Sequence, residues 1–358
     1  MKKKAYLILE DGHIFEGEAF GAEAEVVGEL VFTTGVVGYL ETLTDPCYSG
    51  QIVLQTFPLI GNYGVIPEDL NGNCTVKGYV VREWCDTPSN FRSEYDIDKY
   101  LKEQGIPGIC GVDTREITAI IRDNGVMNAT ICYEIPENTD FLKSYTVANA
   151  IAEVTTEDSF VIEAAEEKKF DVTLINYGKY KGIAAELSKL GCRVTVVPAT
   201  TKAEDIKATN PDGIVLSNGP GDPAENIAEI DCIQKLLGKA PILGVGLGHQ
   251  LLALANGGVT FKLKYGHRGA SQPVKDLNGT HTYITNQNHG YAVAPNSITS
   301  GKVTFVNAND GTCEGIEYPS INAFSVQFHP EECTGPVNTA FVFHKFINMM
   351  GGDENAAE

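Results

Sequence analysis

Residues 241–250 have the pattern of a nucleophile elbow, a tight turn between a buried strand and a helix that presents one reactive side chain. A short apolar run precedes the turn, and a helical pattern begins at His249. Gly244 and Gly248 are small enough for the strand and the helix to pack closely. The turn position, where such a motif carries Cys or Ser, is Gly246, which cannot attack a substrate.

A proton-transfer pair follows the apolar run Ala323–Phe328, which we predict to be a buried strand. His329 at the end of that strand could accept the proton of a thiol, and Glu331 could orient the imidazole ring. Pro330 restricts the backbone between them. A HisProGlu sequence alone is more typical of a surface turn. The catalytic interpretation therefore depends on the other motifs of the chain.

Two glycine-rich loops follow predicted strands, at 217–223 and at 244–248. In parallel sheets, binding sites lie beyond the carboxyl ends of the strands, where both loops would fall. Their glycines would let backbone N–H groups approach a ligand closely. A further segment, 287–290, reads GlnAsnHisGly, which by itself is an ordinary turn sequence.

The elements that must position these loops alternate in the back part of the chain between apolar runs and helical patterns. This alternation predicts βαβ units with a central, mostly parallel sheet flanked by helices. The expected strands are Val172–Ile175, Arg193–Val197, Gly213–Leu216 and Ile242–Val245, and the expected helices are Ile183–Leu190, Lys202–Ala208, Ile227–Leu237 and one from His249 to Ala255.

The front part, residues 1–152, contains short β-type runs separated by Gly, Pro, Asn and Asp, which predicts a mixed, β-rich domain. Residues 153–169 turn acidic and then basic without an apolar face, so we expect a linker there. Residues 170–350 form the expected second domain, and 351–358 a flexible tail. The predicted fold class is α/β with two domains. The front runs are Ala5–Leu9, Gly28–Thr33, Gln51–Thr56 and Cys74–Val81, with helices at Ile97–Gln104 and Arg115–Asn124.

The composition narrows the function classes. The 27 Lys and Arg against 47 Asp and Glu give a net charge of −20, which disfavours nucleic acid and anionic membrane surfaces as partners. No segment has the apolar length of a signal peptide core or a membrane span, which predicts a cytoplasmic protein. The nine cysteines occur singly without a CxxC pair, so we expect no metal site and no disulfide framework.

The motifs together resemble the class I glutamine amidotransferases, and nearly the whole chain is similar to the small subunits of glutamine-dependent carbamoyl phosphate synthetases. In the back part the resemblance rests on SerAsnGlyProGlyAspPro (217–223), GlyHisGln (248–250), TyrGlyHisArgGly (265–269), GlnAsnHisGlyTyrAlaVal (287–293) and PheHisProGlu (328–331). In the front part it rests on the segments 32–46, 58–64, 89–92 and 111–118.

The resemblance implies that the chain is the glutaminase subunit of a heterodimeric ligase complex. This subunit would supply ammonia to a large subunit for arginine and pyrimidine biosynthesis. In that chemistry a thiolate attacks the side-chain amide of L-glutamine, releases ammonia and leaves a thioester that water hydrolyses. A large subunit receives the ammonia through a channel and uses ATP and Mg²⁺. No cofactor is expected in this chain, where no GxxxxGK[ST] loop occurs.

The resemblance also assigns residues. It places His329 and Glu331 in proton transfer, and Gly246 at the nucleophile position with the thiol absent. Glutamine contacts are assigned to Cys47, Gly219, Gly221, Leu247, Gln250, Asn288, Gly290 and Tyr291. The chain departs from the family pattern at Cys47, where Ser is general, and at Asn176, Tyr180 and Gly182, where the pattern is Asp-x-Gly-x-Lys-x-Asn-Ile. Further departures are Ala270 and Ser271. Several changes around one pocket favour natural divergence over an engineered substitution.

Three functions are compatible with these residues. The first is a small subunit whose glutamine hydrolysis is impaired or lost, in a complex that runs on free ammonia. The alternative is a non-catalytic glutamine-binding or scaffolding paralogue. The third moves the nucleophile to Cys47 or Cys333, which the strict geometry of attack disfavours. Because glycine relaxes the strained backbone of an elbow, we expect a well-folded chain with a pocket slightly enlarged at Gly246.

Overall fold

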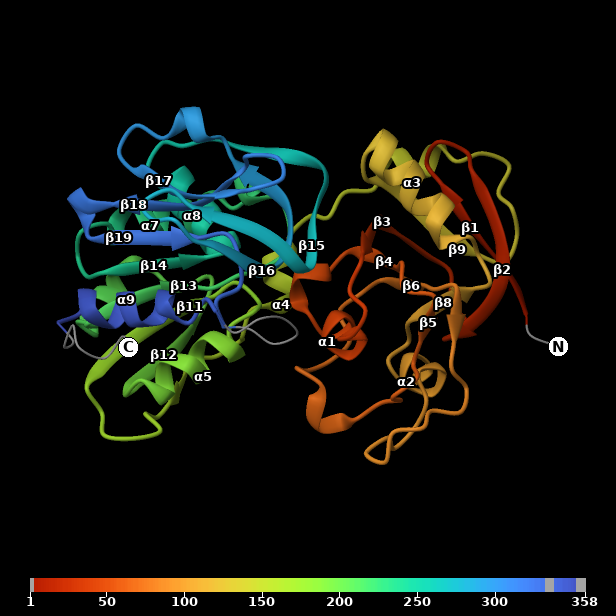
Figure 1. Cartoon of the computed structure of the whole chain (residues 1–358), viewed down its shortest axis with the longest axis horizontal. Helices are drawn as coiled ribbons and strands as arrows, with labels where there is room; N and C mark the ends of the chain where they lie inside the picture. The colour runs from red at the N-terminus through yellow and green to blue at the C-terminus, as the bar shows by residue number, and fades with distance from the viewer. Residues whose placement is uncertain (1–2, 332–337, 352–358) are drawn as a thin grey trace. The chain divides into compact units, whose positions relative to one another are not determined.

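The chain folds into two compact units, Met1–Ala148 and Asn149–Glu358. The computed structural model describes residues 3–331 and 338–351, and Figure 1 colours the first unit in reds and yellows and the second in greens and blues. The expected tail, apart from Gly351, and Cys333 lie outside the described residues. None of the described helices is long and apolar enough to cross a membrane.

The first unit is built on a closed barrel in the order β1-β2-β8-β6-β4-β3-β9. Strand β1 pairs antiparallel with both β2 and β9, which closes the barrel, whereas β3, β4, β6 and β8 pair in parallel. The unit comprises β1 (Lys4–Leu9), β2 (Ile14–Gly21), β3 (Val26–Thr33), α1 (Tyr39–Leu43), β4 (Gln51–Gln55), β5 (Leu59–Ile60), β6 (Gly78–Val80), β7 (Glu83–Trp84), α2 (Ile97–Glu103), β8 (Pro107–Cys110), α3 (Thr114–Asn124) and β9 (Met127–Cys132).

Both predicted helices of this unit start at an aspartate cap. The carboxylate of Asp96 accepts a hydrogen bond from the N–H of Lys99 at the start of α2, and Asp113 caps α3 in the same way. Helix α3 buries Ile117 and Ile121, four residues apart on one face, against the barrel core. The helices begin and end within one residue of the predicted bounds.

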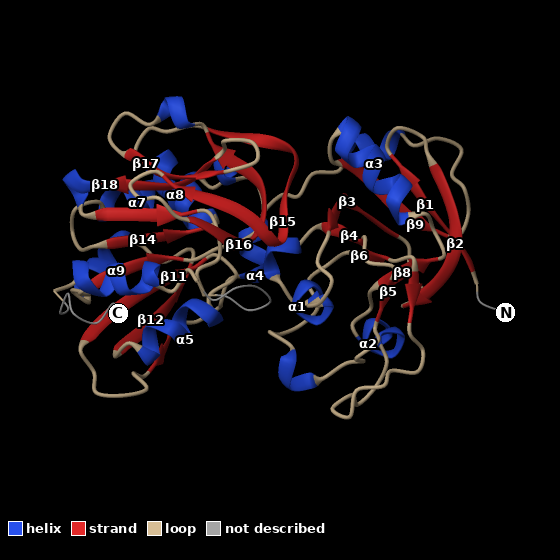
Figure 2. Ribbon diagram, in the orientation of Figure 1, coloured by secondary structure: helices blue, strands red, loops and turns tan. Residues whose placement is uncertain are grey.

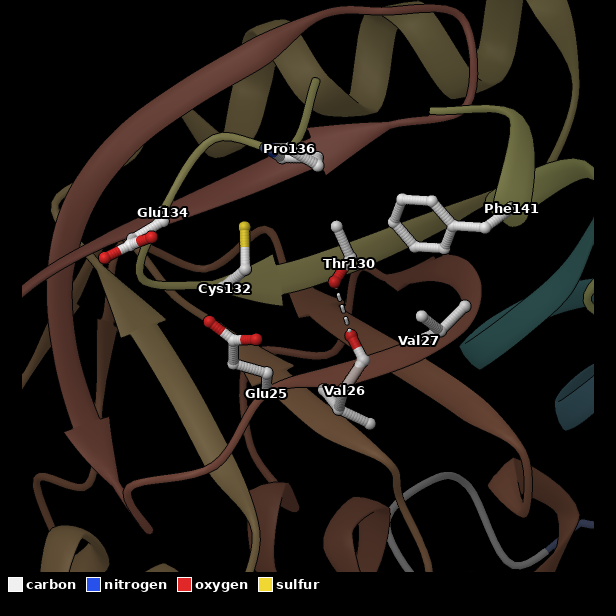
Figure 3. A pocket seen from close by; sticks show the side chains of 8 residues that line it. All are labelled: Glu25, Val26, Val27, Thr130, Cys132, Glu134, Pro136 and Phe141. Carbon is white, nitrogen blue, oxygen red and sulfur yellow. Dashed lines mark hydrogen bonds between the residues drawn. The ribbon is translucent and has the colours of Figure 1, made fainter. Parts of the chain in front are cut away.

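A pocket opens on the barrel beside β3 and β9 (Figure 3). Glu25 and Glu134 lie near the Cys132 thiol, and Phe141 lies on the other side of the pocket. Burial, and secondarily the charge of Glu25, raises the pKa of Cys132 to about 11. This thiol is therefore protonated at neutral pH and is a poor nucleophile.

The second unit contains a ten-stranded sheet in the order β10-β12-β11-β13-β14-β19-β18-β17-β15-β16. The five strands from β12 to β19 run parallel, as predicted, and the remaining neighbours pair antiparallel. Its elements are α4 (Ala150–Val154), β10 (Phe160–Ile162), β11 (Phe170–Asn176), α5 (Lys181–Lys189), β12 (Cys192–Pro198), α6 (Ala203–Ala208), β13 (Gly213–Leu216), α7 (Ile227–Leu236), β14 (Ile242–Val245), α8 (Leu247–Ala255), β15 (Thr260–Asp276), β16 (Thr282–Val293), β17 (Lys302–Asn307), β18 (Cys313–Tyr318), β19 (Ala323–Val326) and α9 (Phe341–Met349).

Apolar side chains on both faces of the parallel strands give this unit two cores. Adjacent side chains of β14 point to opposite faces of the sheet. Ile242 packs in the core under α6, α7 and α8, and Leu243 packs in the core under α5 and α9. Figure 2 shows the helices over the sheet. The predicted α/β class with two domains is confirmed. Its parallel strands could be recognised in the sequence because strands covered on both faces are nearly continuous apolar runs.

The stretch 153–169 differs from the expected linker. Its residues Phe160–Ile162 form β10, which pairs antiparallel with β12 at the edge of the sheet. Phe160 and Val161 are 37% and 40% exposed there, and a run of only three apolar residues is too short to be recognised as a strand in the sequence. Backbone pairing with β12 places this segment in the second unit.

His249 lies in the core rather than at a surface. It is fully buried in α8, and its Nδ1 lies 2.8 Å from Ser325 Oγ in β19. Its Nε2 has no hydrogen-bond partner among the described residues. Burial lowers the pKa of His249 to about 3, so the ring is neutral in the folded chain.

We predict that His249 makes the second unit sensitive to mild acid. Below the unfolded-state pKa of about 6.5, the unfolded chain takes up a proton that the folded chain refuses, so stability falls as pH falls toward 3. Between pH 7 and pH 5, the native chain should lose about 2 kcal/mol more unfolding free energy than His249→Asn. Urea unfolding at both pH values measures this difference. Identical pH dependence of the two proteins would contradict the assignment.

Candidate active site

The turn after β14 has the backbone conformation of a strained elbow. Gly246 has φ +56° and ψ −111°, a region that residues with a side chain rarely adopt. Its N–H donates to Val326 O at 2.9 Å, and the N–H of Gly248 donates to Ser217 O at 3.1 Å. The turn is therefore held by the strands on both sides, β19 and β13.

The small residues that flank the turn are required by packing. A Cβ atom on Gly244 would lie 2.7 Å from the backbone oxygen of Gly248, and one on Gly248 would overlap with the backbone of Leu216. These contacts confirm the predicted close approach of strand and helix at Gly244 and Gly248.

His329 and Glu331 meet just beyond β19. His329 Nδ1 lies 3.2 Å from Glu331 Oε1, both side chains are buried, and the N–H of His329 donates to Asn286 O. Burial alone would raise the pKa of Glu331, but the charge and hydrogen bond of His329 and the charge of Lys179 outweigh it and lower the pKa. Glu331 is therefore ionised and can orient the His329 ring through Nδ1, with Nε2 facing the amide nitrogen of Asn218.

Gly182 lies beside this pair. A Cβ atom on Gly182 would be 2.8 Å from Glu331 Cγ, so Glu331 lies in space that a larger residue 182 would need. The Oε2 atom of Glu331 has no hydrogen-bond partner among the described residues. Asn176 is fully buried, and its Nδ2 also lacks a partner within the described chain.

The side chain of Asn218 occupies the space in front of Gly246. Its Oδ1 accepts hydrogen bonds from the N–H of Leu247 at 2.7 Å and of Gly219 at 2.8 Å, and its Nδ2 lies 3.3 Å from His329 Nε2. A Cβ atom on Gly246 would overlap with Asn218 Cγ and Oδ1. The expectation of extra space at Gly246 is wrong, because a neighbouring side chain fills it.

Sequence reasoning missed Asn218. It lies inside the SerAsnGlyProGly motif, but no local pattern indicates where its side chain points. Gly219, by contrast, was predicted to present its N–H. A Cβ atom on Gly219 would overlap with Tyr177 O, so only glycine allows this approach. Gly221 has φ +91° in the same loop.

The predicted contacts Gln250 and Tyr291 are brought together. Gln250 Nε2 donates to Tyr291 O at 2.7 Å and to Gln327 Oε1 at 2.8 Å. This side chain thereby joins α8 to β16, the strand that also carries Asn288 and Gly290. Asn288 is buried in β16.

Cys47 belongs to the first unit. It is buried, and its N–H donates to Asp45 Oδ1 at 2.9 Å. Within the second unit, burial raises the pKa of Cys192 and of Cys313 to about 12, which keeps both thiols protonated. Neither is an activated nucleophile.

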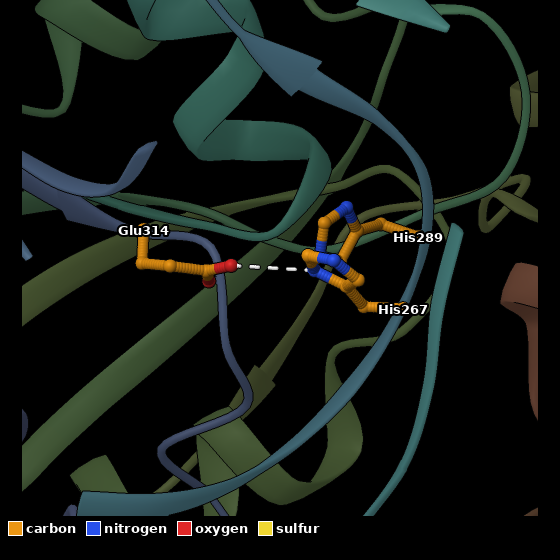
Figure 4. A group of neighbouring side chains, drawn as sticks. All are labelled: His267, His289 and Glu314. Carbon is orange, nitrogen blue, oxygen red and sulfur yellow. Dashed lines mark ion pairs between the residues drawn. The ribbon is translucent and has the colours of Figure 1, made fainter. Parts of the chain in front are cut away.

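A buried polar cluster joins β15, β16 and β18 through His267, His289 and Glu314 (Figure 4). Their potential metal-ligating atoms lie within 4.8 Å of one another. Each ring already has partners, because His267 contacts Glu314 and Asp310, and His289 contacts the oxygens of Tyr291 and Gln287 at 2.7 and 3.0 Å. The cluster is therefore explained as a hydrogen-bonded network that holds β16 in place.

Comparison with known proteins places this geometry in a family. Residues 7–131 match the family described as carbamoyl-phosphate synthase small chain, CPSase domain, and residues 173–349 match glutamine amidotransferase class-I. The carbamoyl phosphate synthase small chain of Listeria monocytogenes serotype 4b (strain F2365) is 46% identical over 358 residues, covering 98% of this chain and 98% of the relative. The chain belongs to the carbamoyl phosphate synthase small chain family.

Other small chains show the same extent of similarity. The small chain of Clostridium perfringens (strain 13 / Type A) is 47% identical over 350 residues, covering 96% of this chain and 99% of the relative. That of Caldanaerobacter subterraneus subsp. tengcongensis is 46% identical over 350 residues, with 97% and 96% covered. The likeness therefore extends over both units of this family member.

We predict that Gly248→Ala destabilises the second unit by about 1–3 kcal/mol, because the added methyl group would overlap with Leu216 in a packed core. Urea unfolding measures the loss. Gly290→Ala is the matched control, since its methyl group would meet only the end of the Arg268 side chain at 3.3 Å. Its cost should stay below about 1 kcal/mol. Equal stability of both variants would show that the elbow is not tightly packed.

Proposed function

We propose that this chain is the small subunit of a carbamoyl phosphate synthase that works with a large subunit on free ammonia, and that its own glutamine hydrolysis is impaired or lost. The observation that carries the proposal is Gly246, which lies at the strained turn beside His329 and two backbone N–H groups but offers no nucleophile. Family membership supports the pairing with a large subunit, because the relatives are named small chains.

The remaining groups match the parts of an amide-cleaving site. The N–H groups of Leu247 and Gly219 point at one oxygen atom, as donors of an oxyanion hole do. His329, oriented by ionised Glu331, has Nε2 directed at the same place and could move a proton there. With a thiol at position 246, these groups could form and break a glutamyl thioester.

Without the thiol, the first bond cannot form. Loss of the nucleophile from a comparable acyl-transfer site lowers turnover by a factor on the order of 10⁶. The subunit would then contribute structure and contacts to the complex, while ammonia from solution replaces the ammonia from glutamine. We expect ATP and Mg²⁺ to bind to the large subunit. The complex would act in the cytoplasm, in the biosynthesis of arginine and pyrimidines.

We predict that the complex with a large subunit makes carbamoyl phosphate from ammonium chloride, and that L-glutamine gives a rate lower by several orders of magnitude. A coupled assay for carbamoyl phosphate with each nitrogen source measures both rates. Fast synthesis from glutamine would refute the loss of hydrolysis. A complex that fails with both sources would leave this chain without the proposed role.

We further predict that Gly246→Cys restores glutamine-driven synthesis, because His329 and the two N–H donors are already in place. Gly246→Ala is the matched control, since it displaces Asn218 in the same way without adding a thiol. Release of ammonia from glutamine is measured for both variants in the complex. An inert Gly246→Cys protein that folds normally would show that Tyr180, Gly182 and Cys47 mark a deeper loss.

A further inference from the structure

Three polar groups at the turn after β14 form a site, called the cradle below, that is complementary to a primary carboxamide. It presents two backbone N–H donors, from Leu247 and Gly219, and one ring acceptor, His329 Nε2. A primary carboxamide has one acceptor oxygen and an NH₂ donor on the same carbon, so it satisfies all three at once. The side chain of glutamine ends in this group, and so does the side chain of asparagine.

We propose that Asn218 is an internal occupant of this cradle and that its carboxamide excludes external carboxamides, L-glutamine included. The proposal rests on the proposed function in one respect, because it takes the cradle to be the site where glutamine would present its amide. It adds that the chain has lost glutamine binding as well as hydrolysis.

The occupancy depends on Gly246. A Cβ atom there would overlap with Cγ and Oδ1 of Asn218, so any side chain at position 246 would force the carboxamide out. With no nucleophile beside it, the amide carbon of Asn218 is not attacked. Glycine at position 246 therefore makes room for the Asn218 side chain and also leaves its amide group unreacted.

The backbone of Asn218 is also held by hydrogen bonds. Its carbonyl oxygen accepts from the N–H of Lys179 at 2.9 Å and from Ser217 Oγ at 3.0 Å, and the residue is 2% exposed. The loop thus delivers the carboxamide to the cradle without a movement of the main chain. Glutamine can enter only after Asn218 rotates away and gives up its three polar contacts.

An internal competitor lowers apparent affinity by the fraction of time that the site is open. If the cradle is open less than about a tenth of the time, removing the competitor raises the affinity for glutamine at least about tenfold. The expected change is therefore a gain of binding, which a damaged or loosened site would not produce.

Isothermal titration of the full chain with L-glutamine tests the proposal. Asn218→Ala empties the cradle and should bind at least about tenfold more tightly than the native chain. Asn218→Asp is the matched control, because it retains the size of the side chain and an acceptor oxygen for both N–H donors. It should bind as weakly as the native chain. Equal affinity of the native chain and Asn218→Ala, or no binding by either, would overturn the proposal.

A second measurement uses the unaltered chain, in case Asn218→Ala does not fold. The side-chain NH₂ resonances of Asn218, assigned by their loss in Asn218→Asp, should exchange slowly with solvent and stay unchanged when L-glutamine is added. Fast exchange like that of exposed asparagines would refute the occupancy. Both measurements concern binding by this chain alone, whereas the proposed function is tested by ammonia-driven synthesis in the complex, so the two can fail separately.

Discussion

Two backbone hydrogen bonds tie the turn after β14 to its neighbours, from Gly246 N–H to Val326 O and from Gly248 N–H to Ser217 O. The rest of the site depends on them. Because β13, β14 and β19 run parallel in register, their carboxyl ends lie side by side. Asn218 follows the first of these strands and His329 follows the last, so residues more than a hundred positions apart meet beside Gly246.

Dense packing explains why the space in front of Gly246 is filled. An unfilled polar cavity would leave two N–H donors and an imidazole nitrogen without partners, which costs free energy in a buried site. Asn218 supplies the missing acceptor and donor from the adjacent loop. The polar groups beside Gly246 therefore have hydrogen-bond partners, although position 246 has no side chain. Gly182 likewise has no side chain, and Glu331 lies in the space that a Cβ atom there would need.

Local patterns predicted the elements of the second unit well. The predicted strands Gly213–Leu216 and Ile242–Val245 are β13 and β14 without change, because buried parallel strands are continuous apolar runs. The closure of the barrel between β1 and β9 and the long ribbon of β15 and β16 were not predicted. Such pairings join segments that carry no local sign of their partner, so strand recognition alone does not reveal them.

The sequence by itself determined which chemical groups the site possesses: His329, Glu331, the glycines that expose backbone N–H groups, and a turn at Gly246 without a nucleophile. The tertiary structure alone decided where the side chain of Asn218 points. A rotamer depends on the space and the partners left by residues remote in sequence, here Gly246, Leu247 and His329. For that reason an asparagine in a common motif reads as a loop residue in the sequence and lies in the amide cradle of the folded chain.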